Sequence, residues 1–416
     1  MSYLSFILAN SRFLGFGFLV MFSSCFGQTY FVALFAPQLR TEFSLSHGDL
    51  GLYYSVGTLA SSVTLLWAGR LIDRFDLRWF VGGVIAGLAA ASALLASVQT
   101  AVAIPIAFCL LRLFGQGLMP HVASTAMSRY FETTRGKALS IATLGSPSSD
   151  ALMPLLVVAS VALVGWRETL NIGAIVLLAT VLPAALLLLR GHRVRHSLFL
   201  RRSKELAVNG SGRGAAWTRA QVLRDPRFWI LAPAMLSPSF VLGGFFFHQA
   251  HLAEEKGWLL SWVASTFAGY ALGVVVTVFV AGPLIDRFGA VRLVPYKLPP
   301  LVLGLVLLAA LDAPVIALVF MVCAGVGAGL GYTLTSATFA ELYGTTHFGA
   351  IRAMVLALAA GISAGSPYLV GVLIDAGVTM ATLAWASAIL LTGATLAAYA
   401  AIRDHPENRN PPQTAG

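Results

Sequence analysis

The chain has 416 residues, of which 58% are apolar and only 11% are charged, with a formal net charge of +10 and a mean hydropathy of +0.82. Soluble domains carry about 25% charged residues, so this composition excludes an ordinary soluble enzyme and indicates a membrane protein. The three cysteines (Cys25, Cys109 and Cys323) lie inside apolar runs without metal-like spacing. We therefore expect no disulfide framework, no metal site and no cofactor.

Apolar runs long enough to cross a bilayer, which takes roughly 20 residues, recur along the whole chain. Reading them between charged or Pro/Gly-rich breaks predicts an all-α membrane protein with twelve transmembrane helices. The first six are expected near 12–36, 50–68, 79–98, 101–128, 138–164 and 168–189. The second six are expected near 228–253, 260–282, 293–311, 314–339, 350–374 and 379–402.

The basic residues predict how these helices are oriented. An even number of spans puts both termini on one side, and that side holds 23 of the 27 Lys and Arg residues. The opposite side holds only Arg40, Arg167 and Lys256, and Arg112 lies inside a helix. By the positive-inside rule both termini are cytoplasmic, in a plasma membrane of bacterial type. The net charge then faces a lipid surface, and no nucleic-acid partner is needed to explain it.

Three short patterns occur twice in the same order. "GRLIDRF" (69–75) returns as "GPLIDRF" (282–288), and "GQGLMPHVASTAMSRYFETT" (115–134) returns as "GAGLGYTLTSATFAELYGTT" (327–346). "GSP" occurs at 145–147 and at 365–367. Nearly equal offsets predict duplication of a six-helix unit, and so two pseudo-symmetric bundles. The expected domains are 1–189 and 228–402, joined by a basic linker at 190–227 and followed by a polar tail at 403–416.

The repeated heptapeptides also carry a resemblance to a known family. "GRLIDRFDLR" and "GPLIDRFGAVR" resemble the G-x-L-x-D-R-x-G-R-[KR] signature of the major facilitator superfamily, and "RLFGQG" (112–117) resembles its fourth-helix pattern. The first copy has Asp76 where glycine is usual, whereas the second keeps Gly289. The resemblance implies two bundles that rock about a central site. It also implies gating roles for Gly69, Asp73, Arg74, Arg78, Gly282, Asp286, Arg287 and Arg292.

Two charged residues fall deep inside predicted helices. Arg112 lies about 11 residues, or roughly 16 Å, into the fourth helix. A charge there costs about 2.5–3.5 kcal/mol or more, so it is either an anion-binding or gating residue or a hydrogen-bond donor to a neighbouring helix. Asp150 lies within "GSPSSDALMP" in the fifth helix. It is a proton carrier, a partner of Arg112 or a helix-packing residue.

Weaker polar candidates surround these two. Gln28, Tyr30, Gln116 and Tyr270 are expected to line a substrate cavity, together with Arg112. His248 and His251 share one face near the outer mouth, and His248 is a proton-coupling candidate beside Asp150. His121 is nine residues from Arg112, on the opposite helix face, and is expected to be structural.

The sequence favours a secondary active transporter of a small organic solute that works by alternating access. "RYFETTRGKALS" faintly resembles monocarboxylate- and oxalate/formate-type members, which favours a proton-coupled carboxylate or organic-anion carrier. Symport and antiport both stay open. The alternatives are proton-driven efflux of hydrophobic or cationic compounds and a non-transporting membrane sensor. We expect the protein to be a monomer, and we do not expect it to be an enzyme. Its expected partners are a small solute, the bilayer and a proton.

Overall fold

The computed structural model describes residues 3–131, 134–191, 217–344 and 348–403, and these residues form helices and connections without any strand. The helices of the N-terminal half are α1 (Tyr3–Ser23), η1 (Ser24–Gly27), α2 (Thr29–Ala33), α3 (Ala36–Phe43), α4 (His47–Ala68), η2 (Gly69–Asp73), α5 (Leu77–Ser97), η3 (Ala101–Ala103), α6 (Ile104–Leu111), η4 (Arg112–Leu118), α7 (Met119–Tyr130), α8 (Arg135–Thr143), α9 (Gly145–Val164), α10 (Trp166–Val176), η5 (Leu177–Val181) and α11 (Leu182–Leu188).

The C-terminal half repeats this arrangement with longer unbroken helices. They are α13 (Arg219–Arg224), α14 (Pro226–Phe247), α15 (Gln249–Glu255), α16 (Leu260–Phe288), α17 (Ala290–Leu293), η6 (Val294–Lys297), α18 (Pro299–Ala310), α19 (Val315–Tyr343), α20 (Phe348–Asp375) and α21 (Met380–Arg403). The predicted linker and tail fall mostly on 192–216 and 404–416, outside the described residues.

Twelve of the described helical segments are long and apolar enough to span a membrane, so the predicted number is confirmed. Two predicted spans differ in detail. The first helix begins at Tyr3, not near residue 12, and is interrupted at Gly27 and Gln28. The seventh ends at Phe247, because the backbone turns at His248 before the short helix α15.

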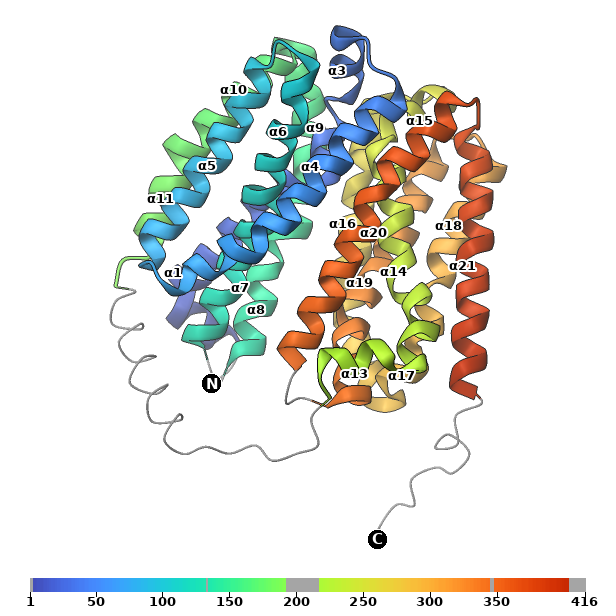
Figure 1. The fold of residues 1–416 in the computed structure, drawn as a ribbon. Helices are drawn as coiled ribbons and strands as arrows, with labels where there is room; N and C mark the ends of the chain where they lie inside the picture. The colour runs from blue at the N-terminus through green and yellow to red at the C-terminus, as the bar shows by residue number, and fades with distance from the viewer. Residues whose placement is uncertain (1–2, 132–133, 192–216, 345–347, 404–416) are drawn as a thin grey trace.

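The two halves lie side by side, with the first half blue to green and the second yellow to red in Figure 1. We call the end that carries α8, α13 and α17 the basic end, and the end that carries α3 and α15 the far end. Helix α1 begins and α21 ends at the basic end (Figure 1). The halves meet through α4 with α20 and through α9 with α16. The ribbons converge toward the far end and diverge toward the basic end (Figure 1).

The two copies of the heptapeptide lie at the basic end and are built differently. In the first, Asp76 accepts a hydrogen bond from the Arg78 amide at 2.9 Å and so caps α5. In the second, Gly289 has φ +80°, a conformation that glycine adopts without strain, and Glu341 caps α17 through the Ala290 amide at 2.7 Å. The unusual Asp76 therefore replaces a glycine turn with an N-cap.

The remaining residues of these copies are mostly exposed. Arg74, Asp286 and Arg287 face solvent, and the side chain of Asp73 lies outside the described part of the structure. The Arg78 guanidinium donates to the Leu189 carbonyl at 3.0 Å, within its own half. His121 contacts the Gly69 carbonyl through Nε2 at 3.0 Å, which is the structural role expected of it. The hydrogen bonds described above for the two copies each stay within one half, and the gating roles stay a prediction.

Candidate functional site

The first helix is interrupted at the point where it packs against the fourth span. Gln28 is extended (φ −76°, ψ 150°), so α2 restarts the helix along a new path. Gly27 packs directly on the fourth span: a Cβ there would lie 2.4 Å from the Leu111 carbonyl oxygen and 2.5 Å from the Gln116 amide. The fourth span is π-helical at this level, over Arg112–Leu118. Only a glycine fits this contact, because both neighbours are backbone atoms.

Arg112 is bound to this interruption. It is 7% exposed, and its Nη1 donates to the Gly27 carbonyl at 3.2 Å and to the Thr29 hydroxyl at 3.3 Å. Its guanidinium carbon lies 5.1 Å from the centre of the Tyr54 ring, and the Tyr54 hydroxyl donates to Thr29 at 2.8 Å. A broken helix leaves carbonyls without donors, and inside a membrane each must find a protein partner. Arg112 supplies the donor for one of these carbonyls, that of Gly27.

We expect Arg112→Met to lower the melting temperature of the purified protein by several degrees. The Gly27 carbonyl would lose its donor, at a cost of about 1–3 kcal/mol, although methionine fills much of the space. Thermal unfolding followed by intrinsic fluorescence measures the effect. Arg70→Met, an exposed arginine of η2, is the control and should leave the melting temperature unchanged. A variant with wild-type stability but weaker substrate binding would contradict the structural role and favour a ligand role.

The nearest polar partner of Asp150 is a tyrosine and not a cation. Its carboxyl faces the Tyr30 hydroxyl, which is buried and has no fully formed hydrogen bond among the described residues. Its charge also acts on the hydroxyls of Tyr270 and Tyr332, which interact with each other. Tyr30 comes from α2, Asp150 from α9, Tyr270 from α16 and Tyr332 from α19. Each half therefore contributes two members, and we call these four residues the tyrosine–aspartate cluster.

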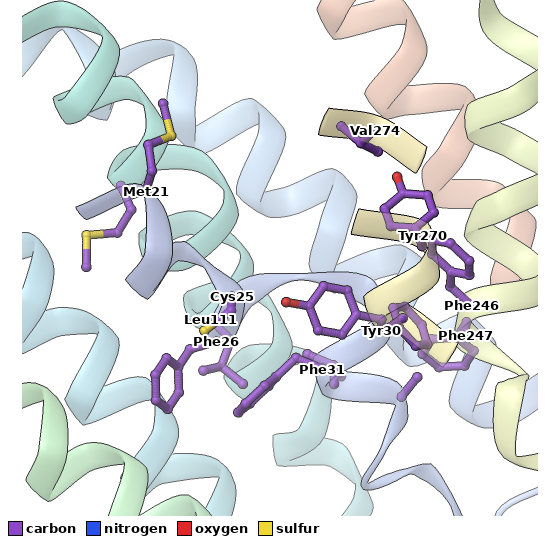
Figure 2. Packing of buried hydrophobic residues seen from close by; sticks show 14 of the residues in the cluster. Met21, Cys25, Phe26, Tyr30, Phe31, Leu111, Phe246, Phe247, Tyr270 and Val274 are labelled. Carbon is purple, nitrogen blue, oxygen red and sulfur yellow. The ribbon is translucent and has the colours of Figure 1, made fainter. Parts of the chain in front are cut away.

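Figure 2 shows how two members of the cluster are oriented. The Tyr30 hydroxyl points toward Cys25 and away from Phe246 and Phe247, and the Tyr270 hydroxyl points toward Val274, one turn nearer the basic end. Tyr332 is 66% exposed, although it interacts with the buried Tyr270 and lies within electrostatic reach of Asp150. Tyr332 is therefore the most exposed member of the cluster, whereas Tyr30 and Tyr270 are buried.

The structure brings together only some of the predicted site residues. Arg112 and Asp150 do not form an ion pair, since each is engaged by other groups. Gln28 and Gln116 are partly buried beside the interruption of the first helix, and their side chains make no printed hydrogen bond. Tyr332 was not singled out from the sequence. Its only signal was a lone tyrosine in a run of small residues, "GLGYTLTS".

A buried lysine was also missed. Lys297 was counted among the loop residues of the basic side, and that placement is wrong: it is 4% exposed, at the end of η6 within the ninth span. Its Nζ donates to the Met235 carbonyl of α14 at 3.2 Å. Met235 lies in the turn before Pro238, which lacks an N–H and so loosens that turn. The predicted ninth span, 293–311, already contains Lys297, so counting this residue with the basic loop is inconsistent with that span.

The far end is closed by direct contacts between the halves. Asp375, at the end of α20, accepts hydrogen bonds from the backbone amides of His47 at 3.0 Å and Gly48 at 2.7 Å. It thereby caps the N-terminus of α4 from the opposite half. A Cβ at Gly51 would lie 2.4 Å from the Pro367 carbonyl oxygen, so α4 and α20 touch through their backbones. A third hydrogen bond between the halves lies near this end, where Gln249 Nε2 of α15 donates to the Tyr30 carbonyl at 2.8 Å.

A small pocket with both apolar and polar lining lies directly behind this closure. Its lining includes Arg40, His47, His248, His251 and Glu254. The His47 ring lies 4.4 Å from the His251 ring and 5.6 Å from the His248 ring, centre to centre. The described residues contain no group of three or more His, Cys, Asp or Glu side chains arranged to hold a metal ion.

Comparisons with known proteins agree with this architecture. The family model described as Major Facilitator Superfamily matches residues 17–364. A bacterial homologue of the human lysosomal transporter Spinster, solved in an inward-facing and occupied conformation, is similar with a TM-score of 0.68 and 14% identity, covering 99% of this chain and 100% of that one. The nucleoside transporter NupG is similar with a TM-score of 0.69 and 15% identity, covering 95% of this chain and 98% of that one. No curated protein matches the sequence.

Proposed function

Because the chain belongs to the Major Facilitator Superfamily, we propose that it is a secondary active transporter that moves a small organic solute by alternating access. The observation that supports this proposal is a difference between the two ends of the interface between the halves. At the far end Asp375 and the backbone of α4 join the halves, whereas Tyr332 is exposed between them nearer the basic end. A binding site reached from one side only is what alternating access requires.

The tyrosine–aspartate cluster is the proposed central site. It joins two helices of each half, so a solute bound there would contact both moving parts. Asp150 is the proposed proton-coupling residue, since an ionisable side chain inside a membrane helix is costly and marks ion or substrate pathways. Tyr30, Tyr270 and Tyr332 would position the solute through their hydroxyls and ring faces. Arg112 would support the site from behind by fixing the interruption of the first helix.

The proposed substrate class is a small organic carboxylate. Two buried cations, Arg112 and Lys297, lie within the described spans, and Arg40 lines the far-end pocket. Their positive potential would attract an anion and raise its local concentration along the path. By the positive-inside rule the basic end would face the cytoplasm, in the plasma membrane of a bacterial-type cell, with the protein acting as a monomer.

A second candidate follows from the chemistry of the cluster itself. A carboxylate and several aromatic side chains in one site could bind an organic cation, through its charge and through cation–π contacts. Proton-driven efflux of hydrophobic or cationic compounds would use the same residues, with Asp150 exchanging a proton for the compound. The two candidates differ in the charge of the ligand, and this difference can be measured.

A thermal-shift screen of the purified protein separates them. The panel should contain small carboxylates, sugars, amino acids and a lipophilic cation such as tetraphenylphosphonium. We expect carboxylates to raise the melting temperature in the wild type and to do so less in Tyr332→Phe. Tyr399→Phe, a tyrosine of α21 that is 51% exposed, is the matched control and should respond as the wild type does. Stabilisation by the lipophilic cation alone would overturn the carboxylate assignment and support the second candidate.

A further inference from the structure

The three histidines behind the far-end closure have no part in the central site. We propose that this closure is an acid-released latch, in which Asp375 holds α4 across the halves and protonation of His47 and His248 opens it. The proposal rests on the alternating access proposed above and adds the means by which the far end senses acid. It assigns to these residues a gate, and not contact with the solute.

The latch itself is the cap that Asp375 places on α4. Two hydrogen bonds from consecutive amides, at 3.0 and 2.7 Å, bind one carboxylate at the positive end of the helix dipole. The geometry depends on Gly48, where a Cβ would lie 2.9 Å from Asp375 Oδ2. A Cβ at Gly371 would lie 2.4 Å from the His47 carbonyl oxygen. Any rotation that separates the halves here breaks both hydrogen bonds and this backbone contact together.

The histidines are placed where an added charge would oppose closure. His248 is 4% exposed, and its Nε2 contacts the Pro367 carbonyl oxygen at 2.9 Å, next to the point where α20 touches α4. His47 carries the first amide of the latch, and its ring packs on both other histidines. Two imidazolium rings with centres 4.4 Å apart would repel each other strongly in this partly buried pocket.

Four other charged side chains lie around the histidines. They come from three elements and comprise Arg40 of α3, Glu254 and Glu255 of α15, and Asp375 of α20. Glu255 already binds the amides of Met380 and Ala381, and Asp375 binds those of α4, so both carboxylates are engaged. His251 lies 4.0 Å from a Glu254 oxygen and 3.8 Å from a Glu255 oxygen. The cation nearest His47 and His248 is Arg40, so a proton added to either ring would face a positive charge.

The direction of the pH effect follows from His248. Burial in the closed state, reinforced by His251 and Arg40 and only partly offset by the Pro367 carbonyl, lowers the pKa of His248 to about 4. In an open far end the ring would be in water, where the usual histidine pKa is about 6.5. The closed state therefore binds fewer protons between these two values. Its stability relative to the open state is lost as the pH falls from about 6.5 toward 4.

Distances between spin labels across the far end test the latch. The labels are placed on Thr100→Cys and Ala313→Cys, two exposed loop residues in opposite halves, with Cys25, Cys109 and Cys323 replaced. In lipid nanodiscs without substrate, we expect a longer distance to gain population when the pH falls from 7.5 to 5. The ratio of open to closed protein should rise on the order of tenfold for one histidine that titrates in this way.

Three variants and one control variant make the test specific. His248→Gln keeps a donor for the Pro367 carbonyl but cannot be protonated, and it should reduce the pH response, which should vanish in His47→Gln/His248→Gln. Asp375→Asn should populate the long distance already at pH 7.5. His121→Gln, at the basic end, is the control and should respond as the wild type does. A full pH response in the double variant, or no pH response in the wild type, would overturn the latch.

The same measurement keeps this proposal apart from the proposed function. If the labels separate in Asp375→Asn but the distances never depend on pH, the latch is overturned and alternating access stands. If the labels do not separate under any condition, including Asp375→Asn and added substrate, alternating access fails and the latch fails with it.

Discussion

Asp150→Asn is expected to abolish proton-driven accumulation of the substrate, with uptake reduced at least about tenfold. An asparagine has nearly the same shape but holds no exchangeable charge, so the carrier would lose the group that links solute to proton. Exchange of external for internal substrate should persist, because the Tyr30, Tyr270 and Tyr332 side chains are unchanged. Proteoliposomes with an imposed pH gradient, compared with counterflow in the absence of a gradient, measure the two activities separately.

The matched control for this variant is Asp312→Asn. Asp312 is an exposed carboxylate of a far-end loop, where it pairs with Lys256, and it lies far from the cluster. Uptake by this variant should equal that of the wild type. Asp150→Glu should restore part of the gradient-driven uptake, because a carboxyl returns to the site. Full accumulation by Asp150→Asn would show that the proton is carried elsewhere, and His248 would be the first place to look.

Gly27→Val is expected to prevent correct folding, the largest stability effect that we anticipate. Its side chain would start 2.4 Å from the Leu111 carbonyl oxygen and 2.5 Å from the Gln116 amide, and backbone atoms inside a helix cannot move aside as a flexible side chain does. Overpacking costs typically 1–3 kcal/mol where side chains can shift, so here we expect about 3 kcal/mol or more. The yield of monodisperse protein and its melting temperature are the measurements.

Gly83→Ala is the control for adding a side chain to a glycine of a membrane-spanning helix. Gly83 lies in α5 with nothing within 4 Å of an added Cβ, and alanine is the better helix former. Its melting temperature should equal or exceed that of the wild type. A Gly27→Val protein with wild-type yield and stability would mean that the first and fourth spans do not pack through this glycine.

The architecture could be predicted because its signals are local. A run of about 20 apolar residues indicates a span by itself, and the two heptapeptides 213 positions apart reveal the duplication without any knowledge of contacts. The depth of Arg112 followed in the same way from its position in the fourth helix. Its partner did not, because the Gly27 carbonyl becomes available only where the first helix is interrupted, and no charge marks that point.

The residues that were missed depend on contacts between distant parts of the chain. Asp375 binds amides 328 and 327 positions away, and a lone aspartate at the end of an apolar run looks like any loop residue. Lys297 lies near the start of the predicted ninth span, and its partner, the Met235 carbonyl of α14, carries no mark in the sequence. The sequence gives no sign of a role for Tyr332, because that role depends on its contact with Tyr270 and on its distance from Asp150 in the folded protein. Such groupings are properties of the packed helices.

Arg112 and Lys297 have a mechanical consequence. Each is a buried cation that donates to a backbone carbonyl of the first helix of its own half, beside an interruption in one case and a proline turn in the other. A bend that is clamped from inside its own bundle cannot serve as a flexing joint. We therefore expect the interrupted first helix and α14 to stay fixed within their bundles. If the halves move as proposed, we expect them to slide and tilt along the α4–α20 and α9–α16 contacts, with each bundle moving as one piece.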